Sequence, residues 1–259
     1  MSGRPLCAHS SLRSFGTVIG GAPAVIEGLL AEGCTVLVPT FSWDAFAVPP
    51  PPAMRPPRNG SNYDALPDAS DGINRVYTVA SCEVDREMGA IPAAVLAMPE
   101  HVRGDHPLCS FSAVGPHAGE LVAGQRPLDV YAPLRALAEL DGAVLCVGVG
   151  LTRMTLLHLA EQQAGRALFR RWANGPDGHP IMVEAGGCSE GFEHFAPVLA
   201  PIERRAMVGE SRWRVFPATE ALRLATAAIR TNPTITHCTN PACGRCDDAV
   251  QGGPVLSPL

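Results

Sequence analysis

The sequence has 259 residues, of which 46% are hydrophobic, so it can fill a substantial core in one large domain or two small ones. Its formal net charge of −5 argues against a nucleic-acid partner, because a nucleic-acid-binding protein needs a basic face. No apolar run reaches the length of about 18 residues that spans a membrane, and the N-terminus does not resemble a signal peptide. We therefore expect a cytoplasmic protein with no membrane partner.

The spacing of apolar residues predicts alternating strands and helices. Continuous apolar runs too short for a helix predict buried strands, and apolar residues three and four apart predict helices. The expected strands cover 34–41, 142–150 and 181–187, and the expected helices cover 18–32, 88–98, 118–124, 132–140, 152–165 and 219–233. This alternation favours a single α/β domain built in layers over residues 1–236, followed by a Cys-rich tail at 237–259.

A segment rich in proline and glycine, 42–74, separates the first expected strand from the next helix. A loop of about 30 residues is unusual inside a compact domain and is often a lid or a binding loop. A plain surface excursion explains the composition equally well. Its acidic residues, Asp64, Asp68 and Asp71, could meet a polycationic ligand, although we favour simple exposure to water.

The most informative segment is the expected strand at 142–150 and the helix that follows it. In open α/β sheets, ligands bind at such a strand-to-helix junction, where free backbone N–H groups face the end of the strand. Thr155, His158 and Glu161 follow at spacings of three, so they share one face of a helix. An imidazole beside a carboxylate is a typical general base. On spacing alone, a solvated polar face is an equally good explanation.

Two further segments carry candidate polar residues. The run HSSLRSFG at 9–16 places hydroxyl groups and small residues ahead of a helix, which suits a phosphate cradle, although an ordinary helix cap is the commoner explanation. In the segment at 103–115, His106 precedes Pro107 and is therefore held on extended backbone. We favour a structural role for His106 in a buried loop.

Taken in order, these segments resemble the aminoglycoside 3-N-acetyltransferase family, the antibiotic N-acetyltransferases that lack the GNAT fold. The resemblance covers roughly residues 9–235 and is carried by the following segments: HSSLRSFGTVIGGAPAVIEGLL, the strand from Gly33 to Phe41, MGAIPAAV, RGDHPLCSFSAVGPHA, GAVLCVGVGLTRMTLLHLAE and GGCSEGFEHFAPVL. It implies a three-layer α/β/α sandwich around a mixed central sheet.

The resemblance also implies an activity linked to antibiotic resistance. Such an enzyme moves an acetyl group from acetyl-CoA to the 3-amino group of a 2-deoxystreptamine aminoglycoside, in a ternary complex without an acyl-enzyme. His158 would be the general base, with Glu161 as the carboxylate that orients it and Glu190 as the alternative. Thr155 would donate a hydrogen bond to the developing oxyanion.

The resemblance assigns the cofactor-binding residues to two places. Those that would border CoA are Ser10, Ser11, Leu12, Arg13 and Gly16. Ser110 would lie nearer the pantetheine arm or the acetyl oxygen. The alternative functions are N-acetylation of another amine and a catalytically silent relative that binds CoA or a metal. A hydrolase with Ser110 or Cys188 as nucleophile is a weaker alternative, because neither residue lies in a G-x-S-x-G elbow.

The short stretch before His9 and two single positions depart from the family pattern. Only eight residues precede His9, so either the sequence begins late or an edge element is missing and part of the sheet is exposed. Gly104 stands where many members have serine, and Ala132 stands where Ser-Pro is usual. Either change could alter the acceptor pocket.

The tail contains His237 and the pattern Cys238-x4-Cys243-x2-Cys246, in which two cysteines two residues apart form a common zinc half-site. A complete site needs a fourth ligand, which His237 or the distant Cys188 would have to supply. We favour a reduced or incidentally oxidised cysteine cluster over structural zinc, and we expect the chain beyond Asp248 to be frayed. We expect a monomer or a homodimer.

Overall fold

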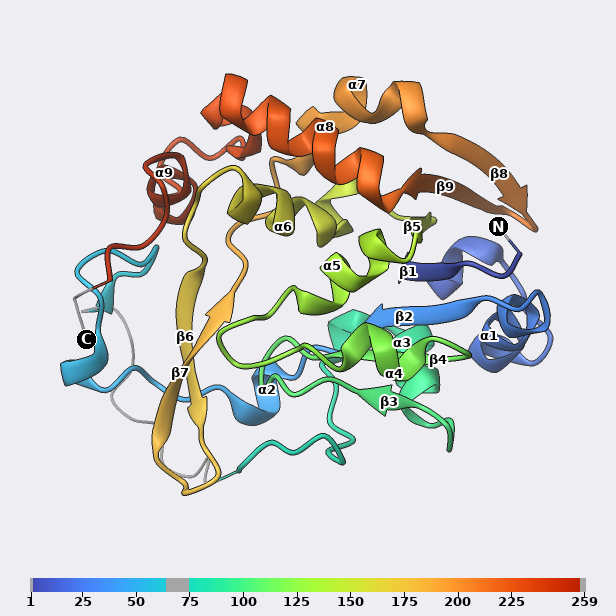
Figure 1. Ribbon diagram of the computed structural model, residues 1–259, viewed down its shortest axis with the longest axis horizontal. Coiled ribbons are helices and arrows are strands. Elements are labelled where there is room, and N and C mark those ends of the chain that lie inside the picture. The colour runs from blue at the N-terminus through green and yellow to red at the C-terminus, as the bar shows by residue number, and fades with distance from the viewer. Residues whose placement is uncertain (1, 64–74, 257–259) are drawn as a thin grey trace.

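A seven-stranded mixed sheet in the order β3-β4-β2-β1-β5-β9-β8 organises the computed structural model, which describes residues 2–63 and 75–256 (Figure 1). Its strands are β1 (Pro5–Ser10), β2 (Thr35–Pro39), β3 (Val102–Arg103), β4 (Phe111–Val114), β5 (Ala143–Val147), β8 (Arg204–Val208) and β9 (Ser211–Pro217). The central strands β2, β1 and β5 are parallel, and the outer strands pair antiparallel.

Helices cover both faces of this sheet, which confirms the three-layer α/β/α architecture. The helices are α1 (Gly21–Ala31), α2 (Trp43–Phe46), α3 (Ala90–Leu96), α4 (Ala118–Val122), α5 (Ala132–Glu139), α6 (Leu156–Gln163), α7 (Ala196–Leu199), α8 (Ala218–Thr231) and α9 (Gly244–Val250). On one face, α1 and α3 pack on β1 and β2. On the other, α4, α5, α6 and α8 share the largest core cluster with the opposite side chains of the same strands.

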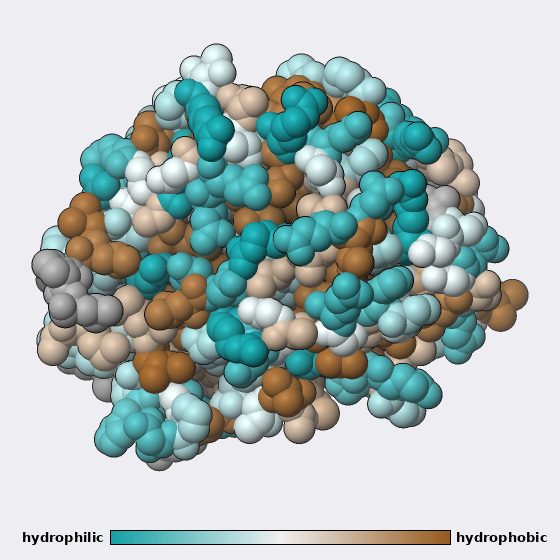
Figure 2. Space-filling model, in the orientation of Figure 1, coloured by the Kyte–Doolittle hydropathy of each residue, from teal (hydrophilic) through white to brown (hydrophobic). Residues whose placement is uncertain are grey.

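The surface and the helix lengths agree with the composition. In the face drawn in Figure 2, hydrophilic side chains are spread across the surface with apolar ones between them. Among residues 2–63 and 75–256, no helix is long and apolar enough to cross a membrane.

Strand β1 differs from the sequence-based expectation. No strand was expected ahead of the HSSL segment, but Pro5–Ser10 forms one. It pairs with β2 on one side and with β5 on the other, so it is central and its edges are not exposed. His9 and Ser10, expected in a loop, are the last two residues of this strand.

The junction after β5 also differs from the expectation. The helix predicted from about Thr152 begins at Leu156, because a 3-10 turn over Leu151–Arg153 comes first. Met154 interrupts the helical backbone between the two, with a ψ of 86°. Thr155 is therefore the N-cap residue of α6 and stands at the mouth of the junction.

A separate hairpin, β6 (Phe169–Asn174) with β7 (Pro180–Ala185), stands beside the main sheet (Figure 1). The strand expected at 181–187 is thus present, but in this second sheet. The segment at 42–63, expected to be part of a long loop, contains α2 and is tied to the hairpin: the Val48 N–H donates to the Trp172 carbonyl at 2.9 Å. Asp64, Asp68 and Asp71 lie outside the described residues.

The tail packs against the rest of the chain, so the expectation of a frayed end beyond Asp248 is wrong for the residues up to 256. After α9, the Gly252 carbonyl accepts from the Ala167 N–H at 2.9 Å. The Val255 N–H then donates to the Arg58 carbonyl at 2.9 Å, and the Arg58 guanidinium returns a hydrogen bond of 2.8 Å to the Gly253 carbonyl. These bonds fasten the tail to the 42–63 segment.

Gly104 has a packing role. A Cβ atom at this position would lie 2.0 Å from Gln125 Oε1, and the Gln125 side chain is fully buried. That side chain cannot easily move, because it accepts from the Phe111 N–H and donates to the carbonyls of Cys109 and Val130.

We therefore expect Gly104→Ala to lower the free energy of unfolding by about 1–3 kcal/mol, as overpacking of a core usually does. Gly119→Ala is the matched control, since a Cβ there meets nothing within 4 Å and lies on the exposed side of α4. That control should be neutral or stabilising by up to about 1 kcal/mol. Urea unfolding measures both, and equal midpoints for the two variants would contradict the packing argument.

Candidate active site

A cleft of about 930 Å³ opens at the carboxyl ends of the three parallel strands. Its lining includes Ser10 and Ser11 at the end of β1, Phe41 after β2 and Val149 after β5. The chain passes from β1 to β2 on one side and later reaches β5 on the other side of β1. This arrangement is a topological switch point, the place where open α/β sheets bind ligands.

His158 lines this cleft from the first turn of α6 and is paired with a carboxylate. Its Nδ1 lies 2.8 Å from Glu161 Oε2, and both side chains are buried. Because the carboxylate accepts, Nδ1 carries the proton and donates it, which leaves Nε2 with a free lone pair. Nε2 faces Gly186, where an added Cβ would lie 2.8 Å away. The helical spacing predicted from the sequence therefore produces the expected hydrogen bond.

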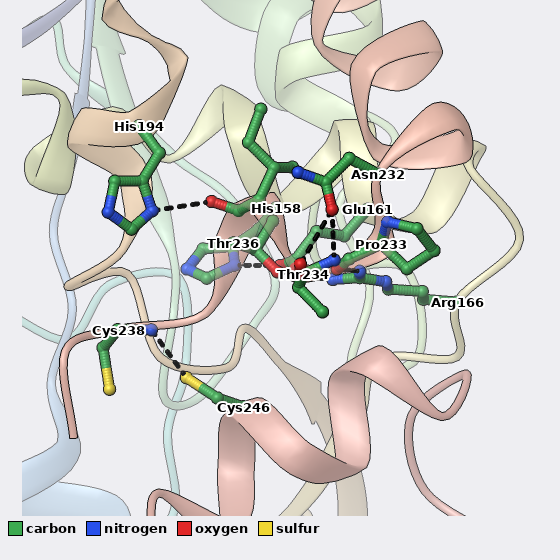
Figure 3. Close-up of polar contacts among 11 residues, drawn as sticks. His158, Glu161, Arg166, His194, Asn232, Pro233, Thr234, Thr236, Cys238 and Cys246 are labelled. Atoms are coloured by element: carbon green, nitrogen blue, oxygen red, sulfur yellow. Dashed lines mark hydrogen bonds and ion pairs between the residues drawn. The ribbon is translucent and has the colours of Figure 1, made fainter. Parts of the chain in front are cut away.

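The second oxygen of Glu161 is held by a buried arginine (Figure 3). Arg166 Nη1 donates to Glu161 Oε1 at 2.6 Å and to Thr236 Oγ1 at 2.8 Å, and its other terminal nitrogen donates to the Pro233 carbonyl. The guanidinium balances the charge of the carboxylate, which would be costly to bury alone. Arg166 thus connects the pair on α6 to the turn that follows α8.

Two aromatic rings enclose the imidazole. Tyr131 stacks parallel to His158 with centroids 6.1 Å apart, and the Phe192 ring lies at 4.7 Å with a tilt of 60°. Burial raises the pKa of Tyr131 well above its usual value, so its hydroxyl stays neutral. The two rings flank the imidazole of His158, which lines the cleft.

Other histidines have different surroundings. His9 also lines the cleft, but burial lowers its pKa to about 4, and its ring contacts the Cys7 thiol at 3.7 Å. His106 is fully buried, and its Nδ1 accepts from the backbone N–H groups of Leu108 and Cys109. Its Nε2 donates to the carbonyl of Glu184 at 2.9 Å. The structural role expected for His106 is confirmed.

The structure brings together some of the residues selected from the sequence. Ser10, Ser11, Arg13, Thr155 and His158 all line the cleft, and Glu161 lies behind His158. Glu190, the alternative partner for the histidine, is exposed.

Other selected residues lie away from the cleft. Ser110 is fully buried, and its hydroxyl accepts from Arg103 and donates to the Thr40 carbonyl, so it does not line the cleft. Leu12 packs against two core clusters, and Gly16 faces the carboxylate of Glu210. Gly104 and Ala132, the two departures from the family pattern, are also absent from the lining.

Sequence reasoning did not find several residues that shape the site. They are Tyr131, Arg166, Gly186, Phe192 and Thr236, together with charged lining residues Asp85, Arg86, Glu87, Arg153, Arg171 and Arg245. Of these, only Gly186 offered a local signal, because a Gly-Gly pair at the end of a predicted strand often allows close approach of a neighbouring group.

The chain belongs to the aminoglycoside 3-N-acetyltransferase family, whose model matches residues 7–230. It is 30% identical over 242 residues to the SPbeta prophage-derived aminoglycoside N(3')-acetyltransferase-like protein YokD of Bacillus subtilis, covering 86% of this chain and 85% of the relative. It is 34% identical to aminoglycoside N(3)-acetyltransferase IX of Micromonospora chalcea over a segment that is 60% of this chain and 54% of that protein.

A similar solved structure is the crystal structure of a mutant of aminoglycoside acetyltransferase AAC(3)-IVa in complex with gentamicin. It superposes with a TM-score of 0.76 at 26% sequence identity, covering 97% of this chain and 92% of the other. The fold and the family assignment therefore agree with the sequence-based resemblance.

The Arg166 contact gives a stability prediction. Arg166→Met should lower the free energy of unfolding by about 3–5 kcal/mol, because it leaves the buried carboxylate of Glu161 without a counter-charge. Arg4→Ala removes an exposed ion pair with Asp141, whose side chain is 74% exposed, and should cost less than about 1 kcal/mol. Denaturant unfolding of both variants checks this, and an Arg166→Met variant as stable as the Arg4→Ala variant would refute it.

Proposed function

We propose that this protein transfers an acetyl group from acetyl-CoA to the 3-amino group of a 2-deoxystreptamine aminoglycoside, with His158 as the general base. The observation that carries the proposal is the His158–Glu161 pair, with Nε2 beside Gly186 in the lining of a cleft at the switch point of the sheet. Membership of the family, and the gentamicin bound to a similar structure, support the choice of acceptor.

Both His158 and His9 line the cleft, but His158 is better suited to act as the general base. A general base works best when its pKa lies near the operating pH, and burial has lowered that of His9 to about 4. Glu161 keeps His158 in the tautomer that leaves Nε2 free, and its negative charge stabilises the imidazolium that forms when Nε2 takes a proton. Arg166 is a positioning residue, because it holds Glu161 without reaching the cleft.

The proposed reaction is a direct transfer within a ternary complex. The amine nitrogen forms a bond to the acetyl carbon, its proton goes to His158 Nε2, and the C–S bond breaks so that CoA leaves as a thiolate that takes up a proton. Thr155, the N-cap of α6 in the lining, would donate a hydrogen bond to the carbonyl oxygen as negative charge develops there. The Cys109 thiol also lines the cleft, but burial raises its pKa, so it is a poor nucleophile for an acyl-enzyme.

The cleft offers different groups for the two substrates. Ser10, Ser11 and the exposed Arg13 line it beside the end of β1, and Arg153 lines it after β5. Hydroxyl and guanidinium groups of this kind bind phosphate and pyrophosphate. The carboxylates of Asp85 and Glu87 also line the cleft and would attract a polycationic acceptor.

The mechanism predicts that His158→Ala lowers the turnover number by about 10²–10⁴-fold, the usual contribution of a positioned base. Acetyl-CoA binding, measured by calorimetry, should remain, because the side chain acts on the amine. The matched control is His117→Ala: this exposed histidine pairs with Glu120 outside the lining and should keep wild-type turnover. A wild-type rate in the His158 variant would show that another group is the base.

An acceptor panel tests the choice of substrate. Purified protein with acetyl-CoA should release free CoA, detected by thiol titration, when gentamicin or kanamycin is added. Neutral sugars lack an amine and should give no release. Thiol release with simple amines but with no aminoglycoside would favour the alternative, an N-acetyltransferase of another amine.

A further inference from the structure

Four cysteines from two distant parts of the chain meet in one cluster. Cys188 lies in the loop after β7, and Cys238, Cys243 and Cys246 lie in the tail, with Cys243 as the N-cap of α9. Their four sulfur atoms all lie within 4.8 Å of one another. All four are free thiols.

This arrangement matches a tetrahedral thiolate site. With Zn–S bonds of about 2.3 Å, the sulfur atoms of a tetrahedral zinc site are roughly 3.8 Å apart, so a small adjustment of the side chains would close the cluster on an ion. Two of the ligands have the Cys-x2-Cys spacing typical of structural zinc sites. The cluster contains no carboxylate, which disfavours magnesium and calcium.

Backbone donors already surround the sulfur atoms. The Cys238 N–H donates to Cys246 Sγ at 3.4 Å (Figure 3), and backbone hydrogen bonds from Glu190 and Cys246 reach the thiols of Cys188 and Cys243. Donors of this kind stabilise the negative charge that four thiolates bring to a metal.

His237, the other candidate for the fourth ligand, is engaged elsewhere. Its Nε2 lies 3.1 Å from Asp247 Oδ1, and its Nδ1 lies 2.8 Å from the carbonyl of Cys238. Cys188 therefore completes the set, although it is 50 residues from Cys238 in the sequence. The tail alone supplies three of the four ligands, and the fold brings in Cys188 as the fourth.

We propose that Cys188, Cys238, Cys243 and Cys246 bind one structural zinc ion, and that this ion fastens the tail to the wall of the cleft. Gly187 and Ser189, on either side of Cys188, both line the cleft. Arg245, between Cys243 and Cys246, lines it as well.

The same ion would also restrain the residues that hold Glu161 against His158. Thr236, two residues before Cys238, accepts the hydrogen bond from Arg166. Figure 3 draws Cys238 and Cys246 in the same view as this contact. Fixing the tail at Cys238 limits how far Thr236 can move. The zinc would thus steady both the wall of the cleft and the residues behind His158.

Metal analysis of the whole chain, purified with reductant and without chelator, tests the proposal. We expect one zinc per chain, lost in Cys188→Ser and in Cys243→Ser. The matched control, Cys82→Ser, should keep its zinc, because Cys82 is exposed and outside the cluster. Absence of metal, iron in place of zinc, a disulfide within the cluster of the freshly purified protein, or full zinc retention by Cys188→Ser would each overturn the proposal.

Two measurements on the unmutated protein guard against variants that do not fold. Replacement of zinc by cobalt should give the intense visible absorption of tetrahedral cobalt with thiolate ligands, and a spectrum typical of octahedral cobalt would overturn the assignment. Removal of zinc by a chelator should abolish hydrogen-exchange protection in 186–190 and 237–250, and unchanged protection would refute the structural role. Neither measurement involves acetyl transfer, so they stand or fall independently of the proposed activity.

Discussion

The carboxylate of Glu161 lies buried between an imidazole and a guanidinium, and the chemistry proposed for the cleft depends on this contact. One oxygen sets the tautomer of His158, and the other is held by Arg166, so the carboxylate cannot turn away from the histidine. A buried charge pair of this kind adds little to stability by itself, but removal of either partner leaves an uncompensated charge. The rings of Tyr131 and Phe192 pack against the imidazole, and the turn after α8 accepts a hydrogen bond from the guanidinium through the Pro233 carbonyl.

Short-range patterns of apolar residues predicted several of the strands and helices correctly. The strands β2 and β5 were found because burial on both faces leaves a continuous apolar run, and the amphipathic α8 was found because burial on one face leaves a helical periodicity. Strand β8 has five exposed residues and therefore no such signal. In β9, buried residues alternate with Arg212 and Arg214, so the signal of a half-buried strand was present and was overlooked. Strand β1 was missed because its polar end, His9-Ser10, resembles the loop that follows it.

In the candidate site too, local spacing revealed some contacts, and others exist only because of the fold. The i, i+3 spacing brought out His158 and Glu161, because an α-helix alone places them together. Arg166 reaches Thr236 across 70 residues, and Gly186 approaches the imidazole from the loop after β7, so no window of sequence could show which groups these residues meet. Ser110 was selected from its motif, yet its hydroxyl is used to hold Arg103 and the Thr40 carbonyl in the core. The fourth cysteine of the cluster was likewise visible only as a distant possibility.

The β6–β7 hairpin, which forms one wall of the cleft, is hydrogen-bonded to the 42–63 segment, and so is the tail. Neither the hairpin nor the tail adds a strand to the seven-stranded sheet. His158 stands on α6, which shares the largest core cluster with that sheet. The reactive group and much of the surface around it thus lie on different elements, which Ala173, Val183 and Ala185 of the hairpin join through the core. Evolution can therefore reshape the hairpin residues that face the cleft, and with them the range of molecules admitted, while these core residues, the base and its supporting charges stay in register.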